Sequence, residues 1–286
     1  MADEPTEILV PAYEYPAPGV WDPLISLAHR APRGAVVVIA NPDNGPGYDP
    51  DTRAYRPTDH NYVRSIADLK KARATVIGYV HDCYGNTNPP EAESCPRLTK
   101  IEDDIARWFE VYDVEGIFID EASHTDVERG AWLTSVVRSH RPDAVVVFNP
   151  GTLPSEEFMA ATDPATVVLQ EQAYRPFGRW PTRGWVKDRE DGVRTVPARR
   201  LGIIAHSPRN GEADVDLLLD VARRYGIGSV YPHHAKGPIY NQLSMFLPML
   251  GRRLWRPTPG WVARRTAVHA RRLARQPFAR RRAAAG

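Results

Sequence analysis

The stretch "GIFIDEAS", residues 116–123, joins an apolar run to two adjacent carboxylates, Asp120 and Glu121. Burying an unpaired charge costs a large amount of free energy, so such a run should end where the chain meets solvent. A continuous run of apolar and β-branched residues is typical of a strand buried on both faces, as in parallel sheets. The segment therefore predicts a buried strand whose carboxyl end reaches a solvent-filled site.

Seven further segments repeat this pattern along the chain. They lie at residues 7–15, 35–42, 74–82, 144–151, 166–174, 201–207 and 228–235. Helical patterns follow nearly all of the eight strand segments, at residues 21–30, 59–72, 100–112, 128–140, 155–161, 214–226 and 241–255. Eight such units over roughly 250 residues match a (β/α)₈ barrel, and a doubly wound open sheet is the competing architecture. We predict a single α/β barrel domain over residues 1–255, of the TIM type, followed by a basic extension.

Bulk composition is that of a globular protein, with 42% hydrophobic residues in a chain of 286. No apolar stretch approaches the ~20 residues that a membrane-spanning helix requires. The amino-terminal segment "MADEPTEILVP" is acidic and lacks the basic start and apolar core of a secretory signal. As written, the sequence predicts a cytoplasmic protein; a true start further upstream would make it secreted or surface-associated.

Charge is distributed unevenly along the chain. From Arg252 onward there are eleven arginines and no acidic residue, which leaves 26 basic against 35 acidic residues in the preceding part, a net charge of about −9. An acidic body argues against nucleic acid as a ligand of the barrel and suits a neutral or cationic one. The Arg/Ala-rich tail, residues 256–286, is expected to be flexible or partly helical and able to contact anionic surfaces. We expect a monomer.

The sequence contains two cysteines, Cys83 and Cys95, twelve positions apart in a segment rich in Pro and Asn. In an oxidising compartment they could pair and close a loop, and in a reducing one they would remain free thiols. The CxxC spacings of structural zinc sites are absent.

Polar and aromatic residues gather at the carboxyl ends of the predicted strands, where (β/α)₈ barrels carry their active sites. Aromatic faces stack on sugar rings, while amides, imidazoles and carboxylates bind hydroxyl groups, so this enrichment indicates a carbohydrate or small-molecule site. The candidate substrate-binding residues are Tyr13, Asn41, His81, Tyr84, Asn149, Tyr174, His206 and His233.

Three carboxylates are the candidate catalytic groups. Because side chains alternate along a strand, Asp120 and Glu121 can both face the barrel axis only if the strand has already bent away. Glu171 ends the sixth predicted strand, and alternate strands contribute to the same layer of a barrel, so Asp120 and Glu171 could face each other across its mouth. Two opposed carboxylates are the minimal equipment for glycoside hydrolysis. We predict Asp120 as nucleophile or charge stabiliser, Glu171 as general acid/base and Glu121 in support.

Two other functions are compatible with this pattern. The barrel could bind carbohydrate without cleaving it. It could also be a metal-dependent hydrolase, although no HxH or HExxH spacing supports a metal site and we predict none. The histidines and acids that such a site would draw on are His81, Asp82, Asp120, Glu121, His206, His233 and His234.

No motif calls for a cofactor. The loop "NPDNGPG" (41–47) lacks the spacing of a phosphate-binding loop, and there is neither a GxGxxG fingerprint nor a GxSxG nucleophile elbow. Asn, Asp, Gly and Pro more simply build tight turns there. We therefore predict an enzyme that works without a cofactor.

Taken in order, the segments "ILVPAYEYP", "VVVIANPDNGPG", "DHNYVRSIADL", "VIGYVHDCYG", "GIFIDEA", "VVVFNPG", "QEQAY" and "IIAHS" resemble the spherulin-4 (spherulation-specific family 4) proteins over roughly residues 8–250. The resemblance implies a (β/α)₈ glycoside hydrolase fold. It also implies endo-acting cleavage of α-1,4-linked galactosamine or N-acetylgalactosamine polymers in microbial exopolysaccharide, such as galactosaminogalactan. The family's acidic pair falls on Asp120 and Glu121, and its sixth-strand glutamate falls on Glu171.

Overall fold

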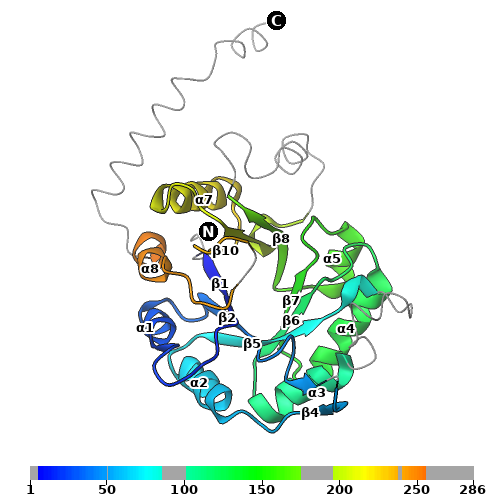
Figure 1. Cartoon of the computed structure of the whole chain (residues 1–286). Coiled ribbons are helices and arrows are strands. Elements are labelled where there is room, and N and C mark those ends of the chain that lie inside the picture. Colours follow the sequence, from blue (N-terminus) through cyan, green and yellow to red (C-terminus); the bar gives the residue numbers. More distant parts are fainter. Residues whose placement is uncertain (1–5, 50, 86–100, 175–195, 238–239, 256–286) are drawn as a thin grey trace, which may run out of the picture.

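The structure, a computed structural model, describes residues 6–49, 51–85, 101–174, 196–237 and 240–255. The basic tail, residues 256–286, and Cys95 lie outside the described residues. Eight parallel strands close into a barrel in the order β1-β10-β9-β8-β7-β6-β5-β2, and the helices surround it (Figure 1). The predicted (β/α)₈ barrel is thereby confirmed, and the open-sheet alternative is excluded by the pairing of β1 with both β2 and β10.

The barrel strands coincide with the eight apolar runs. They are β1 (Glu7–Ala12), β2 (Val36–Ala40), β5 (Thr75–His81), β6 (Gly116–Asp120), β7 (Val145–Asn149), β8 (Thr166–Ala173), β9 (Leu201–His206) and β10 (Ser229–Pro232). Almost every residue of these strands is buried, because one face packs into the barrel and the other against the helices. A short hairpin, β3 (Tyr48–Asp49) and β4 (Ala54–Tyr55), follows β2.

The helices are α1 (Asp22–Arg30), α2 (His60–Lys71), α3 (Ile101–Tyr112), α4 (Val127–His140), α5 (Glu156–Thr162), α7 (Glu212–Tyr225) and α8 (Leu247–Trp255). Their starts follow ordinary capping rules. Asp59, Asp126 and Ser155 each accept a hydrogen bond from a backbone N–H in the first turn of α2, α4 and α5.

The helix predicted over residues 241–255 was wrong in its first third, because α8 begins only at Leu247. Proline is tolerated in the first turn of a helix and not in its interior, so Pro248 favours this late start. Ser244 holds the preceding segment in a non-helical path by donating its hydroxyl to the carbonyl of Pro232, 2.6 Å away. The loop between β10 and α8 is therefore free to carry side chains toward the barrel mouth.

Close packing of α3 on the barrel depends on one glycine. A Cβ atom on Gly78 of β5 would lie 2.2 Å from the indole of Trp108, which is fully buried against the strand. The indole Nε1 also donates to the carbonyl of Tyr79, at 2.8 Å. Glycine is thus required at position 78 to let the helix approach the strand that carries the first site residues.

Strand register determines which side chains face the barrel interior. Residues paired across parallel strands point to the same side, and His81, Asp120 and Asn149 are paired in sequence across β5, β6 and β7. These three positions are the last residues of their strands, so they share the layer that opens at the carboxyl end of the barrel.

Candidate active site

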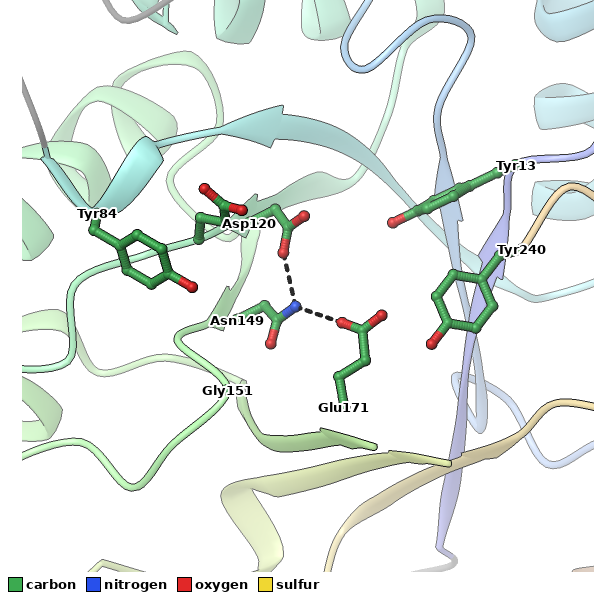
Figure 2. A pocket seen from close by; sticks show the side chains of 8 residues that line it. Tyr13, Tyr84, Asp120, Asn149, Gly151, Glu171 and Tyr240 are labelled. Carbon is green, nitrogen blue, oxygen red and sulfur yellow. Dashed lines mark hydrogen bonds between the residues drawn. The ribbon is translucent and has the colours of Figure 1, made fainter. Parts of the chain in front are cut away.

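A cavity of about 410 Å³ opens at the carboxyl ends of the strands (Figure 2). It is lined by Tyr13, Tyr84, Asp120, Glu121, Asn149, Gly151, Glu171 and Tyr240. Three carboxylates and three phenol rings thus share one concave site, and none of these lining residues is a lysine or arginine. A site of this composition is suited to a polyhydroxylated ligand that is neutral or positively charged.

Asp120 is held at the end of β6 by two donors. The Tyr79 hydroxyl donates to Oδ2 and the Asn149 amide donates to Oδ1, each at 2.7 Å. Burial raises the pKa of the Asp120 carboxyl, and these two hydrogen bonds and the nearby His81 oppose that rise. Asp120 is therefore a buried carboxylate with a fixed orientation and with donors that favour its ionised form.

Glu171 faces the same cavity because β8 is irregular. Val168 pairs with Gly202 and Gln170 pairs with Ile203, so Leu169 is an extra residue in the strand. Such a bulge reverses the alternation of side chains beyond it. Val168 points into the barrel, so in a regular strand Gln170 would point inward and Glu171 outward. With the bulge, Glu171 pairs with Ile204 and points inward.

One amide connects the two acids. Nδ2 of Asn149 donates to Oδ1 of Asp120 at 2.7 Å and to Oε2 of Glu171 at 3.0 Å (Figure 2). Burial and the charge of Asp120 both raise the pKa of Glu171, and the Tyr240 hydroxyl and the Asn149 amide oppose them. Glu171 has the weaker support for its ionised form, because it faces the negative charge of Asp120, whereas His81 favours the ionised form of Asp120.

Glu121 reaches the cavity through a turn of the backbone. Its φ of 47° lies in the left-handed region, which ends the strand and redirects the side chain. Oε2 of Glu121 lies 2.9 Å from Nε2 of His81, and the glutamate side chain is 42% exposed. The adjacent pair of acids thus reaches the same cavity because the strand stops at Asp120.

The turn after β5 forms the edge of the cavity. Cys83 and Tyr84 both have left-handed backbone conformations, and the Tyr84 N–H donates to the carbonyl of Glu121. The Tyr84 side chain is 57% exposed although it lines the cavity, so its ring is open to a ligand. Cys83 is disulfide-bonded.

The side chains of His81, Cys83 and Glu121 lie within 4.8 Å of one another, as in a metal site. A disulfide sulfur cannot act as a thiolate ligand, so this cluster retains two donors, and His81 already contacts Glu121. Two donors are too few for the three or four protein ligands typical of zinc sites. This cluster does not fit a resident metal.

Asp82 is buried behind the cavity and supports the turn that carries Tyr84. Its side chain is 1% exposed, and its Oδ1 accepts from Nε and from an Nη atom of Arg129 at 3.0 and 2.7 Å. Burial raises the pKa of Asp82, and Arg129 opposes this. The Arg129 guanidinium also stacks on Trp132, 4.7 Å from the ring centroid. Asp82 therefore belongs to a structural ion pair.

Replacing Arg129 by leucine should lower the free energy of unfolding by about 3–5 kcal/mol, because it leaves the Asp82 carboxylate buried without its cation. Denaturant titration at pH 7 measures this change. Lys71→Leu is the matched control, since Lys71 pairs with Asp68 at the surface and its loss should cost less than about 1 kcal/mol. An equally small effect for Arg129→Leu would contradict this role of the pair.

An aromatic wall faces the acids from the other side of the cavity. Tyr13 follows β1 and packs edge-on against Tyr79 and Tyr240, with ring centroids 5.7 and 5.9 Å away. In Figure 2, Tyr13 and Tyr240 lie on the side of Glu171 that faces away from Tyr84. Burial and the charge of Glu171 both raise the pKa of the Tyr240 phenol, so this hydroxyl stays protonated and can donate to Glu171.

Sequence reasoning did not identify Tyr240 or Gly151. Tyr240 lies in the loop that was assigned in part to a helix, and His233 explains its position. Nε2 of His233 lies 2.9 Å from the carbonyl of Gln242, and its ring packs edge-on against Tyr240 at 5.1 Å. An aromatic residue in a loop that follows a barrel strand was the available signal. Gly151, at the end of "NPG", offered no chemical signal of its own.

The structure brings together six of the eleven predicted site residues at the cavity: Tyr13, Tyr84, Asp120, Glu121, Asn149 and Glu171. His81 lies behind Glu121, to which it is paired. The remaining four do not line the cavity. They are Asn41, Tyr174, His206 and His233.

Each of these four has a structural contact of its own. Oδ1 of Asn41 accepts from the Gly45 N–H at 2.9 Å and so shapes the loop after β2. The backbone of Tyr174 donates to the carbonyl of His206, which extends the pairing of β8 and β9. The His206 ring contacts the Ser207 hydroxyl at 2.9 Å, and burial lowers the pKa of both His206 and His233.

The fold is a (β/α)₈ barrel with three carboxylates at its mouth, and solved structures share this fold. Sph3 of Aspergillus clavatus, solved in complex with GalNAc, superposes with a TM-score of 0.67 and 23% sequence identity over 87% of this chain and 97% of that one. A family 18 chitinase from Pseudoalteromonas aurantia superposes with a TM-score of 0.53 and 13% identity, over 87% of this chain and all of that one.

The chain belongs to the spherulation-specific family 4, whose model matches residues 7–250. The predicted resemblance is thereby confirmed. Spherulin-4 of Physarum polycephalum is 30% identical over 177 residues, which is 60% of this chain and 46% of that protein. The matched part therefore spans about half the length of this relative. Among the described residues, no helix is both long enough and apolar enough to cross a membrane.

Proposed function

We propose that this protein is an endo-acting glycoside hydrolase that cleaves α-1,4-linked galactosamine or N-acetylgalactosamine polymers with retention of configuration. The observation that carries the proposal is the single amide nitrogen that donates to both acids. Because the two oxygens lie 2.7 and 3.0 Å from that nitrogen, they are at most about 5.7 Å apart. Retaining glycosidases hold their carboxyl groups about 5–5.5 Å apart, whereas inverting ones separate them by about 6.5–9.5 Å to admit a water.

Hydrogen bonds and neighbouring charges divide the roles between the acids. Asp120 accepts from two donors and remains ionised, so it attacks the anomeric carbon and forms a glycosyl-enzyme bond. Glu171 has the weaker support for its charge and retains a proton, which it transfers to the glycosidic oxygen as that bond breaks. Glu171 then takes a proton from water, and the resulting nucleophile displaces Asp120 from the sugar.

Incubating the protein with galactosaminogalactan and defined oligomers tests the activity. Shorter oligomers should appear by mass spectrometry, and proton NMR should show the α-anomer first among the products. A chelator should leave the rate unchanged, because the proposed mechanism uses no metal. Measurable binding with unchanged oligomers would instead indicate a non-catalytic carbohydrate-binding barrel, and initial release of the β-anomer would rule out retention.

Glu121→Gln tests the recognition of amino groups. The Glu121 carboxylate is partly exposed, and none of the described residues that line the cavity is a lysine or arginine, so a deacetylated sugar bearing an ammonium group suits this position. We expect KM for fully deacetylated oligomers to rise about tenfold, because the variant loses one hydrogen bond between charged groups. The KM for fully N-acetylated oligomers should change much less, and an equal change for both substrates would contradict this role.

A further inference from the structure

Asn149 occupies an unusual position between the two acids. It ends β7, which lies between β6 and β8 in the barrel, and its side chain is directed into the gap between Asp120 and Glu171 (Figure 2). The residue is 7% exposed, and its amino group donates to both carboxylates. A primary amide has two N–H groups, and here each can serve a different acid.

The orientation of this amide has a cost. Oδ1 of Asn149 is buried, and it has no hydrogen-bond partner among the residues that the structure describes. An unsatisfied buried acceptor destabilises a protein. Rotating the amide by half a turn would not help, because the carbonyl oxygen would then face two carboxylates, which are acceptors only. The acids thus dictate the orientation, at the expense of the carbonyl group.

The two acids differ in the charges around them. Asp120 has the Tyr79 hydroxyl and the Asn149 amide as donors and His81 nearby, whereas Glu171 has the Asn149 amide and the Tyr240 hydroxyl and faces the charge of Asp120. Among the groups that shift the pKa of Asp120, His81 is the one that can carry a positive charge. The titratable groups that face the pair come from β5 and from the segments after β1, β5, β6 and β10: Tyr79, His81, Tyr13, Tyr84, Glu121 and Tyr240.

We propose that Asn149 is a positioning residue that sets the distance between the two acids and the order in which they lose their protons. This inference rests on the proposed function for its catalytic consequence. With the amide in place, two carboxyl groups are held on either side of one donor, close enough for a retaining displacement and unequal in basicity. Asn149 itself touches the carboxylates and takes no part in bond making.

Asn149→Asp is the sharpest test, because it preserves shape while replacing two donors by a third negative charge. The titration midpoints of Asp120 and Glu171 should both move upward by about one unit or more, the usual effect of a like charge at contact distance. Carbon-13 NMR of the carboxyl groups measures them without any substrate, with Asp120→Asn and Glu171→Gln assigning the two signals. In turnover, kcat should fall about a hundredfold with little change in KM, and the pH optimum should rise.

Asn149→Ala keeps the test decisive if the aspartate variant does not fold, since it removes the donors without adding charge and should still raise both midpoints. The matched control is Asn210→Asp. Nδ2 of Asn210 lies 3.3 Å from Oδ1 of Asp214 at the start of α7. The variant therefore makes the same change from amide to carboxylate beside an acid, at a position that does not line the cavity. This control should leave both midpoints and the kinetics unchanged.

Unchanged midpoints in both Asn149 variants would overturn the inference. Raised midpoints together with an unaltered pH profile of turnover would also overturn it, because the acids would then not be tuned by Asn149 for catalysis. If the wild-type protein cleaves no galactosamine polymer and the midpoints still rise, the proposed function fails. The role of Asn149 in the acid pair would then stand by itself.

Discussion

Replacing Asp120 by asparagine should reduce kcat on galactosamine polymers by a factor on the order of 10⁴ or more, the scale seen when a covalent nucleophile is removed. The amide cannot attack the anomeric carbon, and no other described carboxylate occupies the same place between Tyr79 and Asn149. Initial rates measured by release of reducing ends, at substrate concentrations above and below KM, would give this loss and its division between kcat and KM.

The fold of this variant should survive. An asparagine at position 120 can accept from Asn149 through its carbonyl and donate to the Tyr79 hydroxyl through its amino group, so both contacts remain satisfied. Binding of oligomers should therefore persist and can be measured by calorimetry. Full activity in Asp120→Asn would reject the assignment of this residue, whereas lost binding and a lower unfolding temperature would indicate a structural defect.

Glu171→Gln should reduce the rate on natural polymers by about 10²–10⁴-fold, because no proton reaches the leaving oxygen. A substrate with an acidic leaving group, such as an aryl glycoside, needs no such proton, so formation of its glycosyl-enzyme should be affected much less. Adding azide should then accelerate the second step, because azide attacks the intermediate without a general base. Equal loss on activated and natural substrates would contradict the role of general acid.

The pH dependence of the wild-type protein follows from the same pair. Burial and Asp120 raise the pKa of Glu171 above its ordinary 4.5, so activity should persist above that pH and fall as Glu171 loses its proton. The effect of Glu171 on the pH dependence of stability is opposite to that of a salt-bridged acid, because its raised pKa disfavours ionisation in the folded state. Stability is lost as pH rises from the unfolded pKa through the folded one. Glu171→Gln removes this penalty and should not lower the unfolding temperature at pH 7.

Much of the fold was predictable because parallel barrel strands have a local signature. Strands buried on both faces need continuous apolar runs, and residues 36–40, 116–120 and 145–149 are such runs in an otherwise polar chain. The polar residue that ends each run marks the mouth of the barrel. Asp120 and Asn149 could be assigned to that mouth from their positions alone, since each is the polar residue at which an apolar run ends.

The side chains that actually share the cavity depended on features with no sequence signature. Leu169 is one apolar residue in an apolar strand, yet the bulge there turns Glu171 inward in place of Gln170. The left-handed backbone at Glu121 likewise depends on the loops around it, including the N–H of Tyr84. From the sequence, Asp120 and Glu121 can face one site only if the strand bends after Asp120. The sequence does not show whether the strand bends there.

By itself, the sequence determined eight buried strands and an acidic, aromatic rim, because burial and alternation are properties of single segments. Only the tertiary structure decided which rim residues meet. Asn41 and His233 directly follow β2 and β10, close to the level at which Asn149 ends β7, but their side-chain hydrogen bonds go to Gly45, Ala235 and Gln242 in their own loops. Tyr240 enters the site on a loop with no periodic pattern. Contacts between strands far apart in sequence have no counterpart in local periodicity, and these contacts form the site.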